Sequence, residues 1–211
     1  MVLSMETTKF SVQSVDRAAK AGIVIPTALP LLETSLRVRS QGEAAARLFC
    51  LHAVVAASYG FDNVRALEWL RREGLDALLV DAELSFLQSG NGNPQVFQTQ
   101  VECMWALAWA LSLVGQMDFW TDCDDRFVTL MPNLKVGERI AETQRKLRLR
   151  RDDDLVSACD LAYCLHWAVR QAALEGKQPP ARLKAHVVVE RRRALEWLLS
   201  DERWDAVSLD T

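Results

Sequence analysis

Residues 152–175 read DDDLVSACDLAYCLHWAVRQAALE, a stretch typical of a long helix, which we expect over residues 153–175. The acidic run from Asp152 to Asp154 stands at its N-terminal end, where the helix dipole favours negative charge. Gly176 and the Pro179-Pro180 pair end the helix, because proline cannot continue it. The stretch therefore favours a helical protein.

Helices are also expected on both sides of this stretch. Apolar residues recur three and four positions apart there, and glycines such as Gly60 and Gly74 follow as stops. Residues 95–114 are hydrophobic nearly all round, which is typical of a central, buried helix. The expected helices cover residues 41–59, 64–72, 76–88, 95–114, 126–131 and 183–199.

The fold class that follows is all-α, because the sequence contains no convincing pair of strands and no internal repeat. Pro26 and Pro30 exclude a regular helix around them, so residues 1–40 are predicted to form an extended N-terminal arm of the same domain. Residues 41–211 are predicted to form the helical domain, with the C-terminal tail packed on its surface. The whole is expected to be a single compact multi-helix domain.

Composition narrows the class of protein. The chain has 211 residues, 50% of them hydrophobic, and a formal net charge of -3, so no strong positive field marks a partner such as nucleic acid or an anionic membrane. The longest apolar stretch, from Cys103 to Val114, is shorter than the roughly 18 residues of a spanning helix. Five cysteines without a Cys-x-x-Cys pair indicate reduced, buried thiols and a cytoplasmic location.

Several motifs give the chain a family resemblance. They are Gly22-Ile-Val-Ile-Pro26 with Leu29-Pro30 and Arg37-Val-Arg-Ser40, Glu102-x-x-Trp105-Ala-Leu-x-Trp109-Ala-Leu, Asp160-Leu-x-Tyr163-x-x-His166-Trp167-Ala-Val, Glu190-Arg191-Arg-x-Ala194-Leu-x-Trp197-Leu and Trp204-Asp-x-Val-x-x-Asp210-Thr211. With these motifs the chain resembles a bacterial family known as domain of unknown function 4272, over nearly its whole length. The resemblance implies a mostly helical bacterial domain, and it brings no reaction, cofactor or catalytic residue.

Charged residues beside the tryptophans predict a polar cluster in or next to the core. Asp160 and His166 lie on different faces of their own helix, so any partner of His166 has to come from another helix, such as Glu102 or Glu190. Both glutamates are expected to be half-buried, and a buried carboxylate needs a cation such as Arg191. The other arginines considered for this role are Arg37, Arg39 and Arg193. The cluster is interpreted either as ion pairs that join elements or as a binding site for a small polar ligand.

The tryptophans themselves are interpreted as large anchors of a helical core. Trp105 and Trp109 lie four positions apart, and both are expected in the core. Trp204 stands outside the last helix, where it is predicted to pin the tail. If it is exposed instead, it is a good anchor for an interaction with another protein.

The sequence lacks metal-binding, cofactor-binding and catalytic motifs at their required spacings. None of His52, His166 and His186 forms a metal-binding pair with a second ligand on one helix. The acidic loop at residues 122–125 lacks the glycine and the distal glutamate of a calcium loop, and the glycines at residues 90–94 lack the rest of a phosphate-binding motif. We therefore expect no metal, no cofactor and no catalytic residue.

Two hypotheses about function remain. The first is a non-catalytic helical domain that binds another protein, of which an accessory or immunity-type protein is one concrete form. The second is an enzyme or a small polar-ligand binder. Its candidate binding residues are Glu102, Asp160, His166, Glu190 and Arg191, while Trp204 is a candidate contact for a protein partner.

Overall fold

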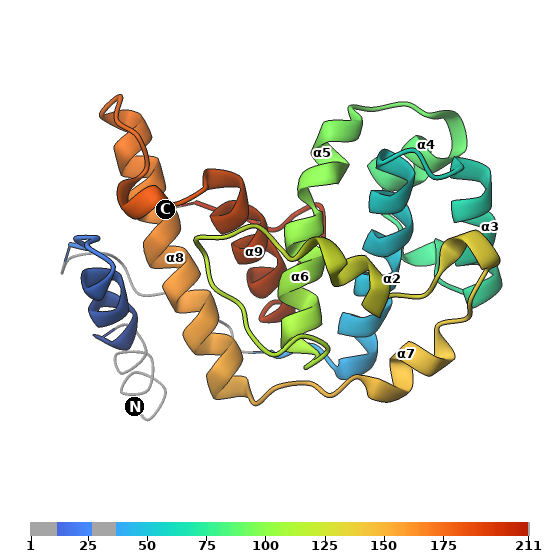
Figure 1. The fold of residues 1–211 in the computed structure, drawn as a ribbon, viewed down its shortest axis with the longest axis horizontal. Coiled ribbons are helices and arrows are strands. Elements are labelled where there is room, and N and C mark those ends of the chain that lie inside the picture. Colours follow the sequence, from blue (N-terminus) through green and yellow to red (C-terminus); the bar gives the residue numbers. More distant parts are fainter. Residues whose placement is uncertain (1–11, 27–36, 211) are drawn as a thin grey trace. The chain divides into compact units, whose positions relative to one another are not determined.

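The acidic run at residues 152–154 begins helix α8 (Asp152–Leu174), which packs along helix α9 (Ala185–Leu198) (Figure 1). The computed structural model describes residues 12–26 and 37–210, and every regular element in these ranges is helical. The predicted all-α class is confirmed. Most of the predicted N-terminal arm, at residues 1–11 and 27–36, lies outside the described residues.

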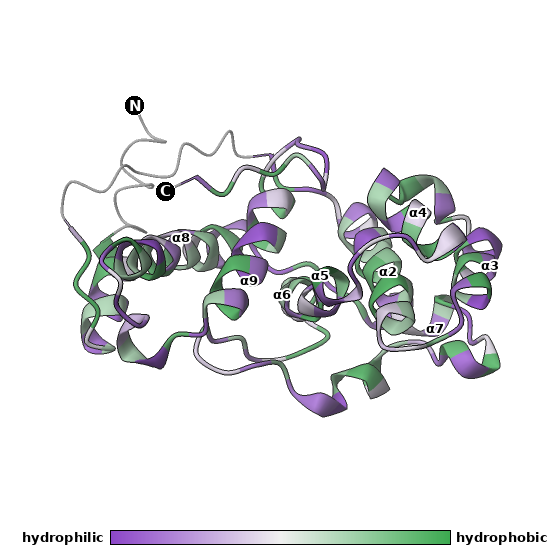
Figure 2. Cartoon of the chain, turned by 90° about the horizontal axis from the view of Figure 1, so that it is seen from above, coloured by the Kyte–Doolittle hydropathy of each residue, from purple (hydrophilic) through white to green (hydrophobic). Residues whose placement is uncertain are grey.

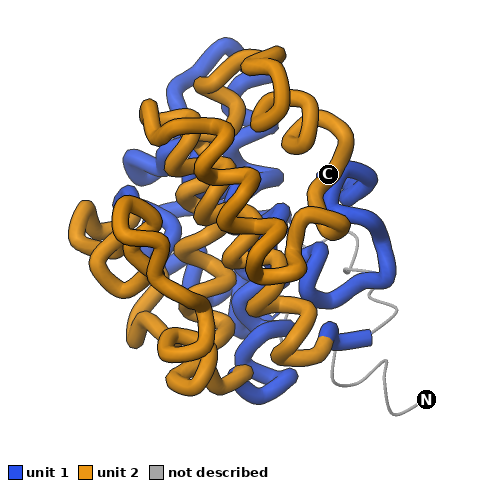
Figure 3. Tube along the Cα trace, turned by 90° about the vertical axis from the view of Figure 1, so that its right-hand side faces the viewer, with its two compact units in different colours: residues 1–39, 118–122, 150–211 blue, residues 40–117, 123–149 orange. Residues whose placement is uncertain are grey.

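The chain forms two compact units (Figure 3). Unit 1 consists of residues 1–39, 118–122 and 150–211, and unit 2 consists of residues 40–117 and 123–149. The single-domain organisation stays a prediction, which one cooperative unfolding transition of the whole chain would support.

Unit 1 is built on α8 and α9, with residues 12–20 forming a further helix. Arg39, near the end of the N-terminal arm, binds the C-terminal end of α9. Its backbone N–H donates to the Leu198 carbonyl at 2.9 Å, its Nε donates to the Trp197 carbonyl at 2.7 Å, and its guanidinium lies 4.3 Å from the centre of the Trp197 ring. Trp204 is buried against the same residue, with its ring 5.6 Å from that of Trp197 and nearly perpendicular to it. Trp197 thus anchors both the arm and the C-terminal tail.

Unit 2 is organised around α2 (Gln41–Ser58), which contacts α3, α5 and α6 and is coloured mainly as hydrophobic in Figure 2. Its first turn is closed by Ser40 and Glu43, each of which accepts a hydrogen bond from the other's backbone N–H. The remaining elements of unit 2 are α3 (Asn63–Glu73), η1 (Asp76–Leu78), α4 (Asp81–Ser89), α5 (Pro94–Thr99), α6 (Val101–Ala110), η2 (Asp125–Leu130), η3 (Leu134–Val136) and α7 (Ala141–Lys146).

The single helix expected over residues 95–114 is wrong in two respects. It is divided at Gln100 into α5 and α6, and α6 ends at Ala110 rather than at residue 114. The early end has a clear cause: Leu113 N–H bonds to the Ala108 carbonyl and Ser112 N–H bonds to the Trp109 carbonyl, the pattern that terminates a helix through a left-handed residue. Ser112 occupies that position with φ of 56°, where glycine is the usual residue.

Ser112→Gly is therefore expected to stabilise the protein by about 0.5–1 kcal/mol, because glycine adopts this conformation without steric strain. Urea unfolding followed by circular dichroism measures the change. Ser85→Gly, in the interior of α4, serves as the control, and it is expected to destabilise by about the same amount because glycine is a poor helix former. Equal destabilisation by both substitutions would contradict the strain at Ser112.

The expectation that Trp105 and Trp109 are core residues also needs correction, because both are partly exposed on α6. Trp105 packs its ring edge-on against Phe127 at 5.3 Å. The buried residues of α6 itself include Cys103, Met104 and Ala108.

The five cysteines are free thiols, and all but Cys123 are buried, in line with the prediction. Among the described residues, no helix is both long and apolar enough to cross a membrane.

Candidate functional site

The residues predicted as a polar site are distributed over three helices. Asp160 and His166 lie on α8 and Glu190 and Arg191 lie on α9, all in unit 1, while Glu102 lies in the first turn of α6 in unit 2. All of them except Glu190 are buried, and Glu190 is partly exposed. Glu102 is more deeply buried than the half-buried position expected of it, whereas Glu190 is partly exposed as expected, and each of the five residues has its own surroundings.

His166 is paired with Arg192, which is on another helix, as required, but is not among the residues expected. The Arg192 Nη1 donates to His166 Nδ1 at 2.7 Å, and its Nε donates to Glu196 Oε1 at 3.0 Å. Burial and the positive charges of Arg192 and Arg170 lower the pKa of His166 to about 4, so the ring is neutral at pH 7. His166 acts here as an acceptor for a buried cation.

The same guanidinium also holds the tail of the chain. Arg192 is 2% exposed, donates to the Leu209 and Asp210 carbonyls at 3.1 and 3.0 Å, and lies over the Tyr163 ring at 4.9 Å. Burial raises the pKa of Glu196, whereas Arg192 opposes that rise. The donors of Arg192 are thus used for joining α8, α9 and the tail.

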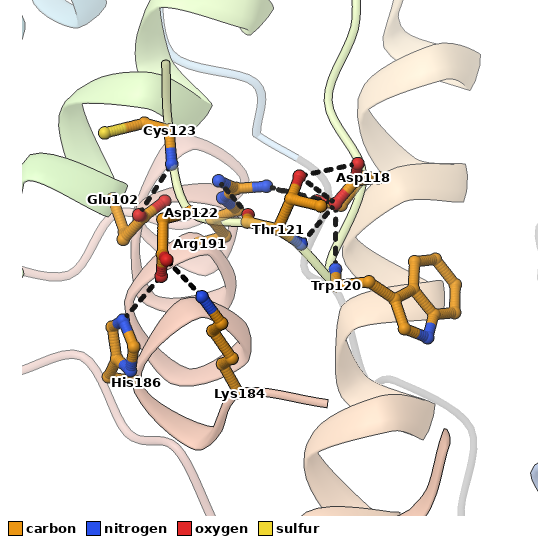
Figure 4. Close-up of polar contacts among 9 residues, drawn as sticks. All are labelled: Glu102, Asp118, Trp120, Thr121, Asp122, Cys123, Lys184, His186 and Arg191. Atoms are coloured by element: carbon orange, nitrogen blue, oxygen red, sulfur yellow. Dashed lines mark hydrogen bonds and ion pairs between the residues drawn. The ribbon is translucent and has the colours of Figure 1, made fainter. Parts of the chain in front are cut away.

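Arg191 has a comparable role toward the loop at residues 118–122. Its Nη1 donates to the Asp118 carbonyl at 2.5 Å and its Nη2 to the Thr121 carbonyl at 2.9 Å (Figure 4). The Asp118 carboxylate in turn accepts the backbone N–H groups of Trp120 and Thr121, and these bonds, with Arg191 nearby, lower its pKa against the opposing effect of burial. A buried arginine therefore fixes the conformation of this loop.

Asp122, at the end of the same loop, meets the start of α9. Its carboxylate accepts a hydrogen bond from Lys184 Nζ and lies 3.1 Å from His186 Nε2 (Figure 4). The bond from Lys184 is the main cause that lowers the pKa of Asp122. All three side chains are exposed, and exposed ion pairs contribute little to stability.

The other predicted site residues have structural surroundings as well. Glu102 Oε1 accepts the Cys123 backbone N–H at 2.9 Å within unit 2. Glu190 Oε2 lies 3.3 Å from the Nε atom of Arg193 on the same helix. Burial raises the pKa of Asp160, and the nearby Ser14 hydroxyl opposes part of that rise. Trp204 is buried against Trp197, so its ring has little surface for a partner.

A second candidate, which the sequence analysis did not find, is an open cleft in unit 2 with a volume of about 960 Å³. We call it the α2–α3 cleft. It is lined by residues between 52 and 65, from the end of α2 and the start of α3, and by residues between 128 and 138, around η2 and η3. Tyr59 and Val128 line it and are 66% and 61% exposed.

The end of α2 shapes one wall of this cleft. Phe61 N–H bonds to the Ala56 carbonyl and Gly60 N–H bonds to the Ala57 carbonyl, with Gly60 at φ of 97°. The chain therefore turns sharply after Tyr59, and Asp62 starts α3 by accepting the Arg65 backbone N–H at 2.8 Å. Local helix-ending and helix-starting signals thus place Tyr59, Phe61 and Arg65 on one wall.

The opposite wall is held by hydrogen bonds to its backbone. His52 Nε2 donates to the Pro132 carbonyl at 2.8 Å, and Arg65 Nη2 donates to the Lys135 carbonyl at 2.7 Å. The Glu138 carboxylate accepts the Asn133 backbone N–H at 2.8 Å. The first two bonds hold residues 132–135 against α2 and α3, and the third closes residues 133–138 on themselves.

Comparison with known proteins places the chain in a family. The model of the family described as domain of unknown function (DUF4272) matches residues 11–207. The chain belongs to this DUF4272 family. No curated protein and no solved structure matches the chain. The match covers residues of both units and includes the α2–α3 cleft, the Arg191 cluster and Arg192, whereas Leu209 and Asp210, whose carbonyls Arg192 binds, lie beyond it.

His52, the buried titratable group of the cleft in this DUF4272 chain, has little capacity for proton transfer at pH 7. Burial lowers the pKa of His52 to about 4, while the bond to Pro132 opposes the shift only in part. A general base or acid works best with a pKa near the working pH, so a neutral His52 of this pKa is a weak base and no acid at pH 7. Asp62 and Glu138 both accept backbone N–H groups. His52 is therefore poorly suited to proton transfer at pH 7.

Proposed function

We propose that this chain is a non-catalytic domain that binds another protein, with the α2–α3 cleft as its binding site. The observation that carries the proposal is the exposure of Tyr59 and Val128 inside a large cleft. Aromatic and aliphatic side chains exposed in a concavity favour an interaction surface, since tyrosine is among the residues that contribute most to binding energy.

The state of the nucleophilic groups supports a non-catalytic role. Burial raises the pKa of Cys50 and of Cys164 to about 12, and it also raises the pKa of Cys159. Because the thiolate is the reactive form of cysteine, these thiols are poor nucleophiles at pH 7. The hypothesis of a polar-ligand site is less well supported, since His166 and Arg191 already form hydrogen bonds within unit 1.

One concrete form of this function is an accessory or immunity-type protein. Such a protein acts by occupying a surface of its partner, so it needs a binding surface and no chemistry. Free, buried thiols also support a cytoplasmic place of action, because reduced cysteines are the rule in that compartment.

Affinity capture from a lysate of the source organism, with chemical crosslinking and mass spectrometry, tests the proposal. Wild-type protein is expected to retain a specific partner, and Val128→Glu is expected to lose it because a charge enters the apolar part of the cleft. Val96→Glu is the matched control: Val96 is exposed at the start of α5, outside the cleft, where a negative charge is tolerated.

Retention of a partner by wild type and Val96→Glu but not by Val128→Glu would support both the function and the site. A partner retained equally by all three proteins would place binding elsewhere on the chain. The absence of any crosslinked partner of the wild-type protein would contradict the proposed function.

A further inference from the structure

The loop between α4 and α5 contains an asparagine that is followed directly by a glycine, Asn91-Gly92. Every residue from Gln88 to Val96 is exposed, so water reaches both residues of the pair. Within the described part of the chain, the Asn91 side chain forms no hydrogen bond or ion pair, and the Gly92 backbone N–H has no acceptor. The side-chain amide and the backbone nitrogen that follows it are therefore both free to react with each other.

The other three asparagines of the sequence are held by hydrogen bonds. The Asn63 amide donates to a backbone carbonyl at 2.8 Å, and the side-chain oxygens of Asn93 and Asn133 each accept a backbone N–H at 3.0 Å. Asn93 is followed by Pro94, which has no N–H, and a bulky aliphatic residue follows each of the other two. Asn91 is thus the asparagine most open to attack by the next residue.

The glycine after Asn91 is required by the backbone of the loop. Gly92 has φ of 121°, in the region that favours glycine over residues with a Cβ atom. The ends of the loop are held by the stacked rings of Phe86 on α4 and Phe97 on α5, whose centres are 4.6 Å apart. The fold therefore keeps at position 92 the residue type that hinders attack by its own nitrogen least.

We propose that Asn91 is a site of spontaneous covalent modification, at which the side-chain amide is lost and a mixture of aspartate and isoaspartate forms. The Gly92 nitrogen attacks Asn91 Cγ and closes a succinimide ring, while the bond from Cγ to the amide nitrogen breaks. The proton of the Gly92 N–H is passed through water to the leaving nitrogen, which departs as ammonia. No oxidant, reductant or enzyme is needed.

Water then opens the succinimide ring in one of two ways. Addition at Cγ breaks the bond from Cγ to the Gly92 nitrogen and gives aspartate in place of Asn91. Addition at the main-chain carbonyl carbon breaks the original peptide bond and gives isoaspartate, in which the chain continues through Cγ. The two products have the same composition and differ only in the path of the main chain.

Either product changes an exposed surface of unit 2. Both carry a carboxylate, which adds a negative charge to a chain whose formal net charge is -3. Isoaspartate also places an extra carbon atom in the main chain between α4 and α5. Asn91 does not line the α2–α3 cleft, and this inference does not depend on the proposed binding function. Because the converted fraction grows with time after synthesis, it records the age of the molecule.

Incubation of the purified full-length protein at neutral pH tests this inference. Cleavage of the unfolded, aged protein after glutamates, at mildly acidic pH where deamidation is slow, releases residues 84–102 with both Asn91 and Asn93. Mass spectrometry is expected to find conversion that increases with time at Asn91 and stays at background at Asn93. Incubation at a more alkaline pH is expected to raise the rate several-fold, because the Gly92 nitrogen attacks after losing its proton.

Asn91→Gln is the blocked variant, because glutamine has to close a larger ring and is expected to react slower by about tenfold or more. The side chain at this position has no partner among the described residues, so folding is expected to be intact, and circular dichroism checks this. Enzymatic methylation of isoaspartate is expected to label aged wild type and not the aged variant. A synthetic peptide of residues 84–102 gives the rate of the same sequence without the fold.

The outcomes decide the inference in either direction. Conversion in the folded protein at a rate within about tenfold of the peptide's rate would support it, since the loop leaves both groups free. A peptide that converts while the folded protein does not would overturn it, because the loop would then hold the nitrogen away from Cγ. Conversion at Asn63, Asn93 or Asn133 as fast as at Asn91, or equal isoaspartate labelling of wild type and Asn91→Gln, would overturn it as well.

Discussion

Glu83→Ala is expected to lower the free energy of unfolding by about 3–5 kcal/mol, because it leaves the buried Arg47 guanidinium without its carboxylate. Arg47 in α2 and Glu83 in α4 are 4% and 1% exposed, and their Nη2 and Oε1 atoms are 2.5 Å apart. The other oxygen of Glu83 accepts the Val80 backbone N–H at 3.1 Å, which closes the first turn of α4. The substitution therefore removes both an ion pair and a helix cap.

Urea unfolding at pH 7 measures this change. Glu142→Ala, which breaks the exposed pair with Lys146 on α7, is the control and is expected to change stability by less than about 1 kcal/mol. The double variant Arg47→Met with Glu83→Leu is expected to recover most of the loss, since apolar residues of similar volume need no counter-charge. A small loss of unfolding free energy in Glu83→Ala alone would contradict the prediction, because it would mean that water reaches the Arg47 guanidinium and replaces the carboxylate.

Lowering the pH from 7 to 5 is expected to remove about 2 kcal/mol of stability through His52 alone, rising to roughly 3 kcal/mol below pH 4. Burial lowers the pKa of His52 from 6.5 to about 4 in the folded protein. The unfolded chain therefore binds a proton in this interval while the folded protein does not. The stability that depends on a neutral His52 is present above about pH 6.5 and is lost as the pH falls toward 4.

Other groups contribute to the pH dependence of the whole protein. His166, with its pKa also lowered to about 4, acts in the same direction, whereas Asp160 and Glu196, with raised pKa values, favour the folded state on acidification. The difference between wild type and His52→Gln isolates one residue, because glutamine can still donate to the Pro132 carbonyl. Unfolding free energies of the two proteins at pH 7 and pH 5 are compared. Equal losses in both would mean that His52 is not the group responsible.

The helices were predictable because their apolar spacing and their end signals are local. Residues 41–58 and 152–174 agree with the expected bounds to within one residue. The division at Gln100 and the early end at Ser112 were missed, since the apolar pattern continues through both and serine is an unusual residue for a left-handed helix end. The backbone conformation at these points depends on contacts that the pattern does not contain.

The site was predictable in its residue types but not in its pairing. The sequence indicated buried charges on α8 and α9, yet Arg191, Arg192 and Arg193 follow one another, and the order alone does not tell which guanidinium meets His166. The partners of Arg192 at residues 209 and 210 are backbone carbonyls, which leave no trace in side-chain motifs. The cleft was missed because its walls come from separate segments, and Gly60 was interpreted only as the end of a helix.

The loop that Arg191 holds has a consequence for how this protein can be divided. Residues 118–122 belong to unit 1, although the chain before and after them belongs to unit 2. A gene fragment that encodes residues 150–211 alone would lack the carbonyls that bind the Arg191 guanidinium, and a fragment that ends at residue 117 would lack residues 123–149 of unit 2. Neither unit can be transferred by recombination as one uninterrupted piece of sequence, so we expect the two units to be inherited together.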